Sequence, residues 1–205
     1  TAYNNLAIAS HGSFTNQDDD SRGFNITALA PTTSITPITV TEGGVSQTFQ
    51  VSLTSVPCDS PSTPNTCNPT SVTITLSNNN PTEYTISPST LTFTPGNWNV
   101  NQTVTVTAVD DFIDNANSNY TLVLNPIVST TDYSGLDPSD IAIQVLNNDT
   151  AGFTINPAGG VTVNENDPGG VGLEATITVV LNSEPTGNVT LGPVISDGIL
   201  EVTVA

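Results

Sequence analysis

The sequence predicts an all-β protein, and three observations support this prediction. Thr, Ser, Asn, Val, Gly and Pro dominate the 205 residues, 36% of residues are hydrophobic, and only 5% are aromatic. β-Branched and turn-forming residues favour short strands that are joined by tight turns. No stretch shows an apolar stripe that repeats every 3.6 residues, so helix is nearly excluded. The length allows one or two domains, each with a buried core.

The clearest strand is the stretch QTVTVTAVDD at residues 102–111, in which apolar residues alternate with threonines. Successive side chains of a strand point to opposite faces of the sheet, so this period of two predicts one buried and one solvated face. The alternation stops at Asp110 and Asp111. We therefore expect two carboxylates at the end of this strand, followed by an Asn-rich loop.

The other strands are expected where β-branched runs lie between turn signals such as Gly43-Gly44 and Pro95-Gly96-Asn97. About seven short strands at this spacing predict an antiparallel two-sheet sandwich of the immunoglobulin-like kind. Trp98 is expected to plug the edge of the sandwich. The expected strands cover residues 24–29, 37–41, 47–54, 71–77, 90–94, 102–109, 119–125 and 140–146, of which the first two form one split strand.

Several blocks of the sequence recur in the same order. They divide the chain into the end of one repeat at 1–22, a complete repeat at 23–150 and the first part of a further repeat at 151–205. The chain is therefore expected to be part of a tandem array. The matching blocks are 18–26 with 147–155, 38–44 with 161–165, 51–57 with 179–185, and Tyr3-Asn-Asn-Leu6 with Tyr133-Ser-Gly-Leu136.

The charge of the chain excludes several classes of partner. There are 19 acidic residues against a single Lys or Arg, which gives a formal net charge of −18. Nucleic acid needs basic residues to displace its counterions, and an anionic membrane surface would repel this chain. No run of about 18 apolar residues is present, so we expect no membrane insertion, and no signal peptide is visible. The acidic residues either keep the chain soluble through mutual repulsion, or are neutralised in part by bound divalent cations, or do both.

Two cysteines indicate an oxidising compartment. Cys58 and Cys67 enclose a Pro-, Ser- and Thr-rich segment without His, so we expect a disulfide that closes a surface loop, with free thiols as the alternative. This loop is inserted directly after Pro57 and has no counterpart after Pro185. An extracellular or cell-surface protein is expected. Candidate glycosylation sequons, some of them expected by chance in so Asn- and Thr-rich a chain, begin at Asn25, Asn101, Asn119, Asn148 and Asn188.

The block at 87–111, the preceding Val40-Thr41-Glu42 and the closing Asn147-Asn148-Asp149 resemble the Calx-beta repeats of large bacterial surface proteins. The resemblance implies a β-sandwich that binds Ca²⁺ at the end where the chain leaves for the next domain. Carried over to this sequence, the ligands of the complete repeat are Glu42, Asp110, Asp111 and Asp149. The preceding repeat would contribute Asp18, Asp19 and Asp20, and the following repeat Glu165, with Asp197 as a further candidate.

The chain departs from the family pattern in its closing triplet, where Asn147 and Asn148 replace carboxylates, and after the aspartate pair, where Asp114 and asparagines replace glutamates. Asparagine can still offer a carbonyl oxygen to Ca²⁺, although fewer charges weaken binding. Oxygen ligands without His or thiolate favour Ca²⁺ over transition metals. The alternative is that these acids lie in solvated turns, where Asp and Asn are favoured by local hydrogen bonds.

The sequence gives no reason to expect an enzyme. A Ser or Cys nucleophile needs an adjacent base, and the only histidine is His11, at the expected end of a repeat. The leading hypothesis is a structural segment that forms a spacer, fibre or filament body, with neighbouring copies or repeats as partners. The rival is an adhesin module that binds glycan or protein through its loops, including the Cys58–Cys67 loop. A weaker rival is an accessory domain of a secreted enzyme.

The arrangement of the repeats leaves a further alternative open. The chain is either a piece of a longer covalent array or a subunit whose partial repeats complement each other by strand exchange between copies. Residues 1–22 supply only one or two strands, so simple complementation leaves the following repeat short of strands.

Overall fold

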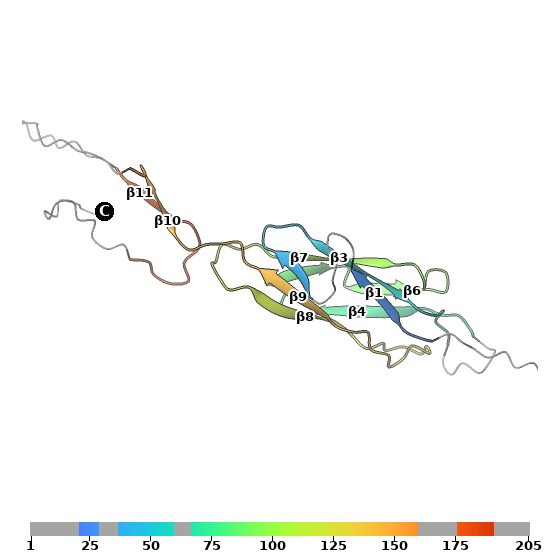
Figure 1. Cartoon of the computed structure of the whole chain (residues 1–205). Helices are drawn as coiled ribbons and strands as arrows, with labels where there is room; N and C mark the ends of the chain where they lie inside the picture. Colours follow the sequence, from blue (N-terminus) through green and yellow to red (C-terminus); the bar gives the residue numbers. More distant parts are fainter. Residues whose placement is uncertain (1–20, 29–36, 60–66, 160–175, 191–205) are drawn as a thin grey trace, which may run out of the picture.

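The structure is a computed structural model that describes residues 21–28, 37–59, 67–159 and 176–190 (Figure 1). Every regular element in these residues is a strand, so the all-β prediction is confirmed for them. His11 and several predicted ligands lie outside the described residues: Asp18, Asp19, Asp20, Glu165 and Asp197.

Nine strands form two sheets. One sheet has the order β1-β3-β7-β5 and the other has the order β2-β9-β8-β4-β6. All neighbouring strands are antiparallel except β2 and β9, which are parallel. The bounds are β1 Phe24–Ala28, β2 Ile38–Thr41, β3 Gln47–Leu53, β4 Val72–Asn78, β5 Tyr84–Ser87, β6 Thr90–Phe93, β7 Gln102–Ala108, β8 Ser118–Leu124 and β9 Ile141–Leu146.

The core lies between these two sheets and is built by alternation. In β7 the side chains of Val104 and Val106 are fully buried, whereas Thr103 is exposed. Strand β4 repeats the pattern, with buried apolar residues separated by exposed threonines. Both sheets contribute to one contiguous hydrophobic cluster, so the fold is β-sandwich-like.

Most of the expected strands are present. The split first strand divides between the sheets, because β1 pairs with β3 and β2 pairs with β9. Trp98 packs partly buried against the core, and its carbonyl accepts a hydrogen bond of 2.8 Å from the Leu53 amide. Strand β5 was not predicted, because its four residues contain a single fully buried side chain, Tyr84, and run directly into a turn signal.

Tyr133 closes the end of the unit at which β1 begins and β3 ends. Its side chain is fully buried, and its ring meets that of Phe24 edge-on at 5.9 Å between centroids. Its hydroxyl donates to the Ser55 carbonyl at 2.9 Å and accepts from the Ser55 amide at 3.2 Å. The adjacent Asp132 accepts from Arg22 Nε at 2.7 Å, which fixes the chain just before β1 to the same end.

The predicted disulfide between Cys58 and Cys67 is present at this end of the unit. A β-bridge pairs Cys58 with Pro69, and the Asp59 amide donates to the Asn68 carbonyl at 2.9 Å. The two ends of the inserted loop are therefore held together by backbone pairing as well as by the disulfide.

A separate two-stranded sheet follows the complete unit. It consists of β10 (Phe153–Asn156) and β11 (Thr178–Leu181), which lie beyond the end of β9 in Figure 1. Phe153 pairs with Leu181 as Phe24 pairs with Leu53, and Ile155 pairs with Val179 as Ile26 pairs with Val51. The amide after β11 also donates to the Gly152 carbonyl at 2.9 Å, as the amide after β3 donates to the Gly23 carbonyl at 3.1 Å. The two strand pairs have the same register.

Candidate metal centre

Three strand ends bring carboxylates to one end of the complete unit. Glu42 directly follows β2, Asp111 follows β7, and Asp149 follows β9. Strands β2 and β9 are parallel neighbours in one sheet, so their carboxyl ends coincide. Strand β7 ends beside the β2–β3 turn because it is antiparallel to β3, which starts from that turn. The topology therefore gathers acids that are far apart in the sequence.

One carboxylate oxygen from each of Glu42, Asp111 and Asp149 lies within 4.8 Å of the other two. Glu42 is only 4% exposed, and the two aspartates are half-buried. The predicted grouping of these three residues is confirmed. The fourth predicted ligand, Asp110, is more exposed and contacts the centre through an amide.

That amide belongs to Asn148. Its Nδ2 donates to the Glu42 carbonyl at 2.8 Å and to Asp110 Oδ1 at 3.3 Å. Gly43 passes beside it with φ of +62°, and a Cβ there would lie 3.0 Å from Asn148 Nδ2 and 3.1 Å from Asp110 Oδ1. Glycine is required here both by the left-handed backbone and by the close approach. Asn148 thus holds the β2–β3 turn against the carboxylates.

Burial raises the pKa of Glu42, with further increases from the negative charges of Asp111, Asp149 and Asp110, while a backbone hydrogen bond from Asn148 opposes the shift. Desolvation likewise raises the pKa of Asp149, and neighbouring aspartates add to the shift. Like charges and loss of water both disfavour the ionised form. Glu42 and Asp149 therefore hold a proton more tightly than an ordinary surface carboxylate does.

Two buried carboxylate oxygen atoms indicate whether a cation fits between Glu42 and Asp149. Within the described residues, Glu42 Oε2 and Asp149 Oδ2 are buried and have no hydrogen-bond partner. Unsatisfied buried carboxylate oxygens are costly and rare in native proteins. Several carboxylate oxygens, with no sulfur or imidazole among them, form the donor set that a hard cation such as Ca²⁺ prefers. Glu42, Asp111 and Asp149 could therefore hold a metal ion of this kind.

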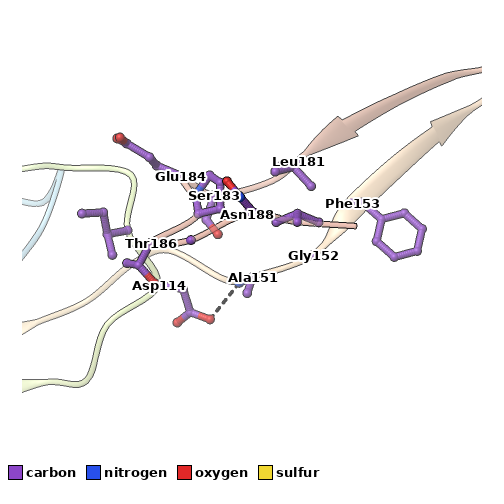
Figure 2. Close-up of a pocket in the computed structure, with 13 residues that line it drawn as sticks. Asp114, Ala151, Gly152, Phe153, Leu181, Ser183, Glu184, Thr186 and Asn188 are labelled. Atoms are coloured by element: carbon purple, nitrogen blue, oxygen red, sulfur yellow. Dashed lines mark hydrogen bonds between the residues drawn. The ribbon is translucent and has the colours of Figure 1, made fainter. Parts of the chain in front are cut away.

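The loop after β7 links the centre to the following strand pair. Asp114 Oδ2 accepts from the Ala151 amide at 2.8 Å (Figure 2). Asp114 Oδ1 accepts from Asn147 Nδ2 at 3.3 Å. The Phe112 carbonyl accepts a hydrogen bond from the Glu184 amide, just beyond β11. One short loop therefore carries Asp110 and Asp111 toward the centre and contacts the chain just before β10 and just after β11, which is one and the same end of the next strand pair.

The sequence identified the carboxylates but not the roles of the three residues that organise them. Asn148 and Asn147 were expected as weak substitutes for acidic ligands, whereas their amide nitrogens donate to carbonyl and carboxylate oxygens. Asp114 was noted only as a replacement for a glutamate, and it ties the joint to Ala151. All three residues are visible in the sequence as Asn or Asp near strand ends, but their hydrogen-bond partners depend on the tertiary arrangement.

The predicted sequon asparagines are exposed, which is compatible with modification. For Asn148, however, both amide hydrogens serve the centre, so a glycan at this residue would remove one of its two hydrogen bonds. The five sequon asparagines lie at Asn25, Asn101, Asn119, Asn148 and Asn188.

The sequence matches no protein-family model and none of the curated proteins with which it was compared.

Proposed function

We propose that this chain is a non-catalytic structural segment of a secreted or cell-surface protein, built of tandem immunoglobulin-like β-sandwich repeats of the Calx-beta kind. In this proposal a calcium ion stiffens the joint between the complete repeat and the next one. The observation that carries it is the buried centre of Glu42, Asp111 and Asp149 at the end where the chain leaves the unit.

The repeat is supported by register. Strands β10 and β11 pair residue by residue as β1 and β3 do, and the sequence blocks that predicted the repeat fall on these strands. Two unrelated strand pairs would have no reason to share both the pairing and the hydrogen bond that closes it. This correspondence supports the proposed division into a complete repeat at 23–150 and the first part of a further repeat at 151–205.

Stiffening is supported by the path of the loop after β7. A bound calcium ion would neutralise the repulsion among the carboxylates and fix this loop to the ends of β2 and β9. The same loop holds the Ala151 amide through Asp114 and meets Glu184 through Phe112. Ordering the loop therefore restricts the direction in which the next strand pair leaves.

A location outside the cell is supported by the Cys58–Cys67 disulfide, since such bonds persist in oxidising compartments. The strongly acidic composition and the exposed sequon asparagines agree with that setting. Among the described residues, no helix is long and apolar enough to cross a membrane.

An adhesin role is the alternative, and one observation favours it. The Cys58–Cys67 loop is inserted in the connection between β3 and β4, and a β-bridge and a disulfide hold its two ends together. A spacer needs no such fixed loop, whereas a recognition loop does. Replacing residues 59–66 by a short glycine linker should abolish attachment to glycan or protein if the loop is a recognition element. Unchanged attachment with the fold intact would remove this alternative.

Calcium binding to the full chain tests the leading proposal. Calorimetric titration should show binding that Asp111→Asn weakens about tenfold or more, because one ligand charge is lost. At 100 times the dissociation constant, calcium should stabilise the unit by about 2.7 kcal/mol. Small-angle scattering should show a more extended, less variable particle with calcium than with chelator.

The matched control is Asp137→Asn, which removes the same charge from an exposed residue outside the centre. It should leave calcium affinity within about twofold of the parent chain. Identical melting and scattering with calcium and with chelator would show that the joint needs no cation.

A further inference from the structure

The chain enters and leaves the complete unit at opposite ends. At the entry, Thr54 Oγ1 donates to the Ser21 carbonyl. Arg22 pairs there with Asp132, which directly precedes the buried Tyr133. At the exit, β9 ends beside the acidic centre and the chain continues to β10 and β11 (Figure 1). Tension applied through the chain therefore runs along the strands and not across them.

Strands β2 and β9 can separate under this tension only by sliding past each other. They are parallel neighbours, paired in register from Ile38 and Ile143 to Thr41 and Leu146. Pulling at the entry draws β2 toward its beginning, whereas pulling at the exit draws β9 toward its end. All hydrogen bonds of such a ladder are stretched together, whereas a strand pair that is opened from one end loses its bonds one after another.

Strand β1 has the same relation to its neighbour in the other sheet. It is antiparallel to β3 and pairs with it from Phe24 and Leu53 to Ala28 and Phe49. Strand β3 is held in turn by β7 along its other edge. Pulling at the entry draws β1 along its own axis, so its pairing with β3 is also loaded as a whole. Both sheets thus resist tension along their ladders.

Two further hydrogen bonds lie at the exit end of the β2–β9 ladder. The Glu42 amide donates to the Leu146 carbonyl at 3.0 Å, and Asn148 Nδ2 donates to the Glu42 carbonyl at 2.8 Å. They join the residue that follows β2 to the last residue of β9 and to the chain beyond it. The inward side chains Val40 and Val145 are buried in the core, so sliding would also expose apolar surface to water.

We propose that the complete unit bears tension along the chain, and that the β2–β9 ladder with its two end bonds is the main element that resists it. We call this element, defined by residues 38–42 and 141–148, the terminal clamp. Resistance to force depends on the rate of unfolding under load, and that rate falls when more interactions must break before the barrier is crossed. The direction of loading therefore determines the resistance as much as the number of bonds does.

This inference rests on the proposed structural role, because only a segment that is held at both ends carries tension, but it does not require calcium. An ion held by Glu42 and Asp149 would join the same two strand ends and should slow unfolding under load further. A terminal clamp that resists force in chelator, with no change in calcium, would overturn the calcium joint alone. Calcium binding by a chain without this resistance would overturn the terminal clamp alone.

The test holds single full-length chains in optical tweezers at constant load, in chelator, and compares two directions of pulling. In the first, DNA handles are attached to the two chain ends, and the complete unit is recognised by a length gain of roughly 35–40 nm. In the second, the C-terminal handle moves to Val128→p-azidophenylalanine, a 95% exposed position at the entry end. This direction opens strand pairs from one end, so unfolding should be about tenfold faster or more at the same load. Equal rates in both directions would overturn the proposal.

Two asparagine variants locate the resistance. Asn148→Ala removes the donor to the Glu42 carbonyl and should speed unfolding about 3- to 10-fold when the chain ends are pulled, but less than about twofold in the second direction. The matched control is Asn125→Ala, which removes an amide donor 2.8 Å from the Thr75 carbonyl, between β8 and β4. It should change the end-to-end rate by less than about twofold. Equal acceleration by Asn148→Ala in both directions, or by both variants in the first, would indicate general destabilisation and overturn the assignment of the terminal clamp.

Discussion

Strand pairs β1–β3 and β10–β11 have the same register and differ almost entirely in what covers them. In the complete unit, β3 pairs on its other edge with β7, and the inward side chains Val51 and Leu53 are buried. In the second pair, every residue of β10 is exposed, as are most residues of β11. Within the described residues the two pairs therefore share their backbone pairing, whereas only the first is covered by the opposite sheet and by Tyr133.

The comparison shows where the free energy of folding lies. A two-stranded ribbon is marginal in water, because its hydrogen bonds replace bonds to solvent and little apolar surface is removed from water. The same ribbon in a two-sheet unit contributes its whole inward face to the core. Equivalent residues of the two pairs should thus respond very differently to substitution.

The largest expected difference is between Leu53→Ala and Leu181→Ala, which remove the same side chain at the same register. Leu53→Ala should lower the free energy of unfolding of the complete unit by about 2–5 kcal/mol, because it leaves a cavity in the core. Leu181→Ala should change it by less than about 0.5 kcal/mol. Urea unfolding of the full chain, followed by Trp98 fluorescence, measures both. Equal effects would mean that the second pair is as well packed as the first.

The next effect concerns Tyr133. Tyr133→Phe should cost about 1–2 kcal/mol, because the Ser55 amide and carbonyl both lose their partner while the ring contact with Phe24 remains. The same urea experiment measures it. As a control, Ser55→Ala removes only the side-chain hydroxyl, which lies 3.0 Å from the tyrosine hydroxyl, and should cost less. A Tyr133→Phe variant as stable as the parent would show that the two hydrogen bonds to Ser55 contribute nothing to this end of the unit.

A smaller effect, informative by its sign, concerns Glu42. Because its folded-state pKa is raised, the folded state holds this proton more tightly than the unfolded chain. The resulting stabilisation is present below the ordinary pKa and is lost as the pH rises through the raised value. In chelator at neutral pH, Glu42→Gln should therefore be at least as stable as the parent, and the difference should shrink as the pH falls toward 4.

Calcium should reverse this order at neutral pH, since the parent chain gains a bound ion and the variant loses a ligand. Thermal melting at several pH values, with chelator and with calcium, measures both signs. A Glu42→Gln variant that is less stable than the parent in chelator would show that the carboxylate is satisfied without a cation.

The smallest effect concerns the joint. Asp114→Ala should accelerate hydrogen exchange of the Ala151 amide about two- to fivefold, because that amide loses its acceptor, while the melting of the complete unit stays unchanged. Asp137→Ala is the control at an exposed acid outside the joint. Unchanged exchange at Ala151 would mean that Asp114 does not fix the strand pair to the unit.

Much of this architecture follows from local sequence. The alternation in β4 and β7 predicts which side chains are buried, because a strand has a period of two whatever its neighbours are. The disulfide followed from two cysteines that flank a short insertion. Strand β5 escaped prediction because four residues carry too little pattern, and its position depends on pairing with β7.

The acidic centre divides in the same way. Asp110 and Asp111 stand out in the sequence because they end an alternating strand, and Glu42 because it ends another. Three further features were decided by how the sheets stack. Glu42 Oε2 and Asp149 Oδ2 are buried without partners within the described residues, Asn148 serves as a donor, and Asp114 reaches Ala151. Periodicity is a property of neighbours in sequence, so the chain alone determined its strands. Contacts between strand ends depend on topology, so only the tertiary structure decided which carboxylates meet.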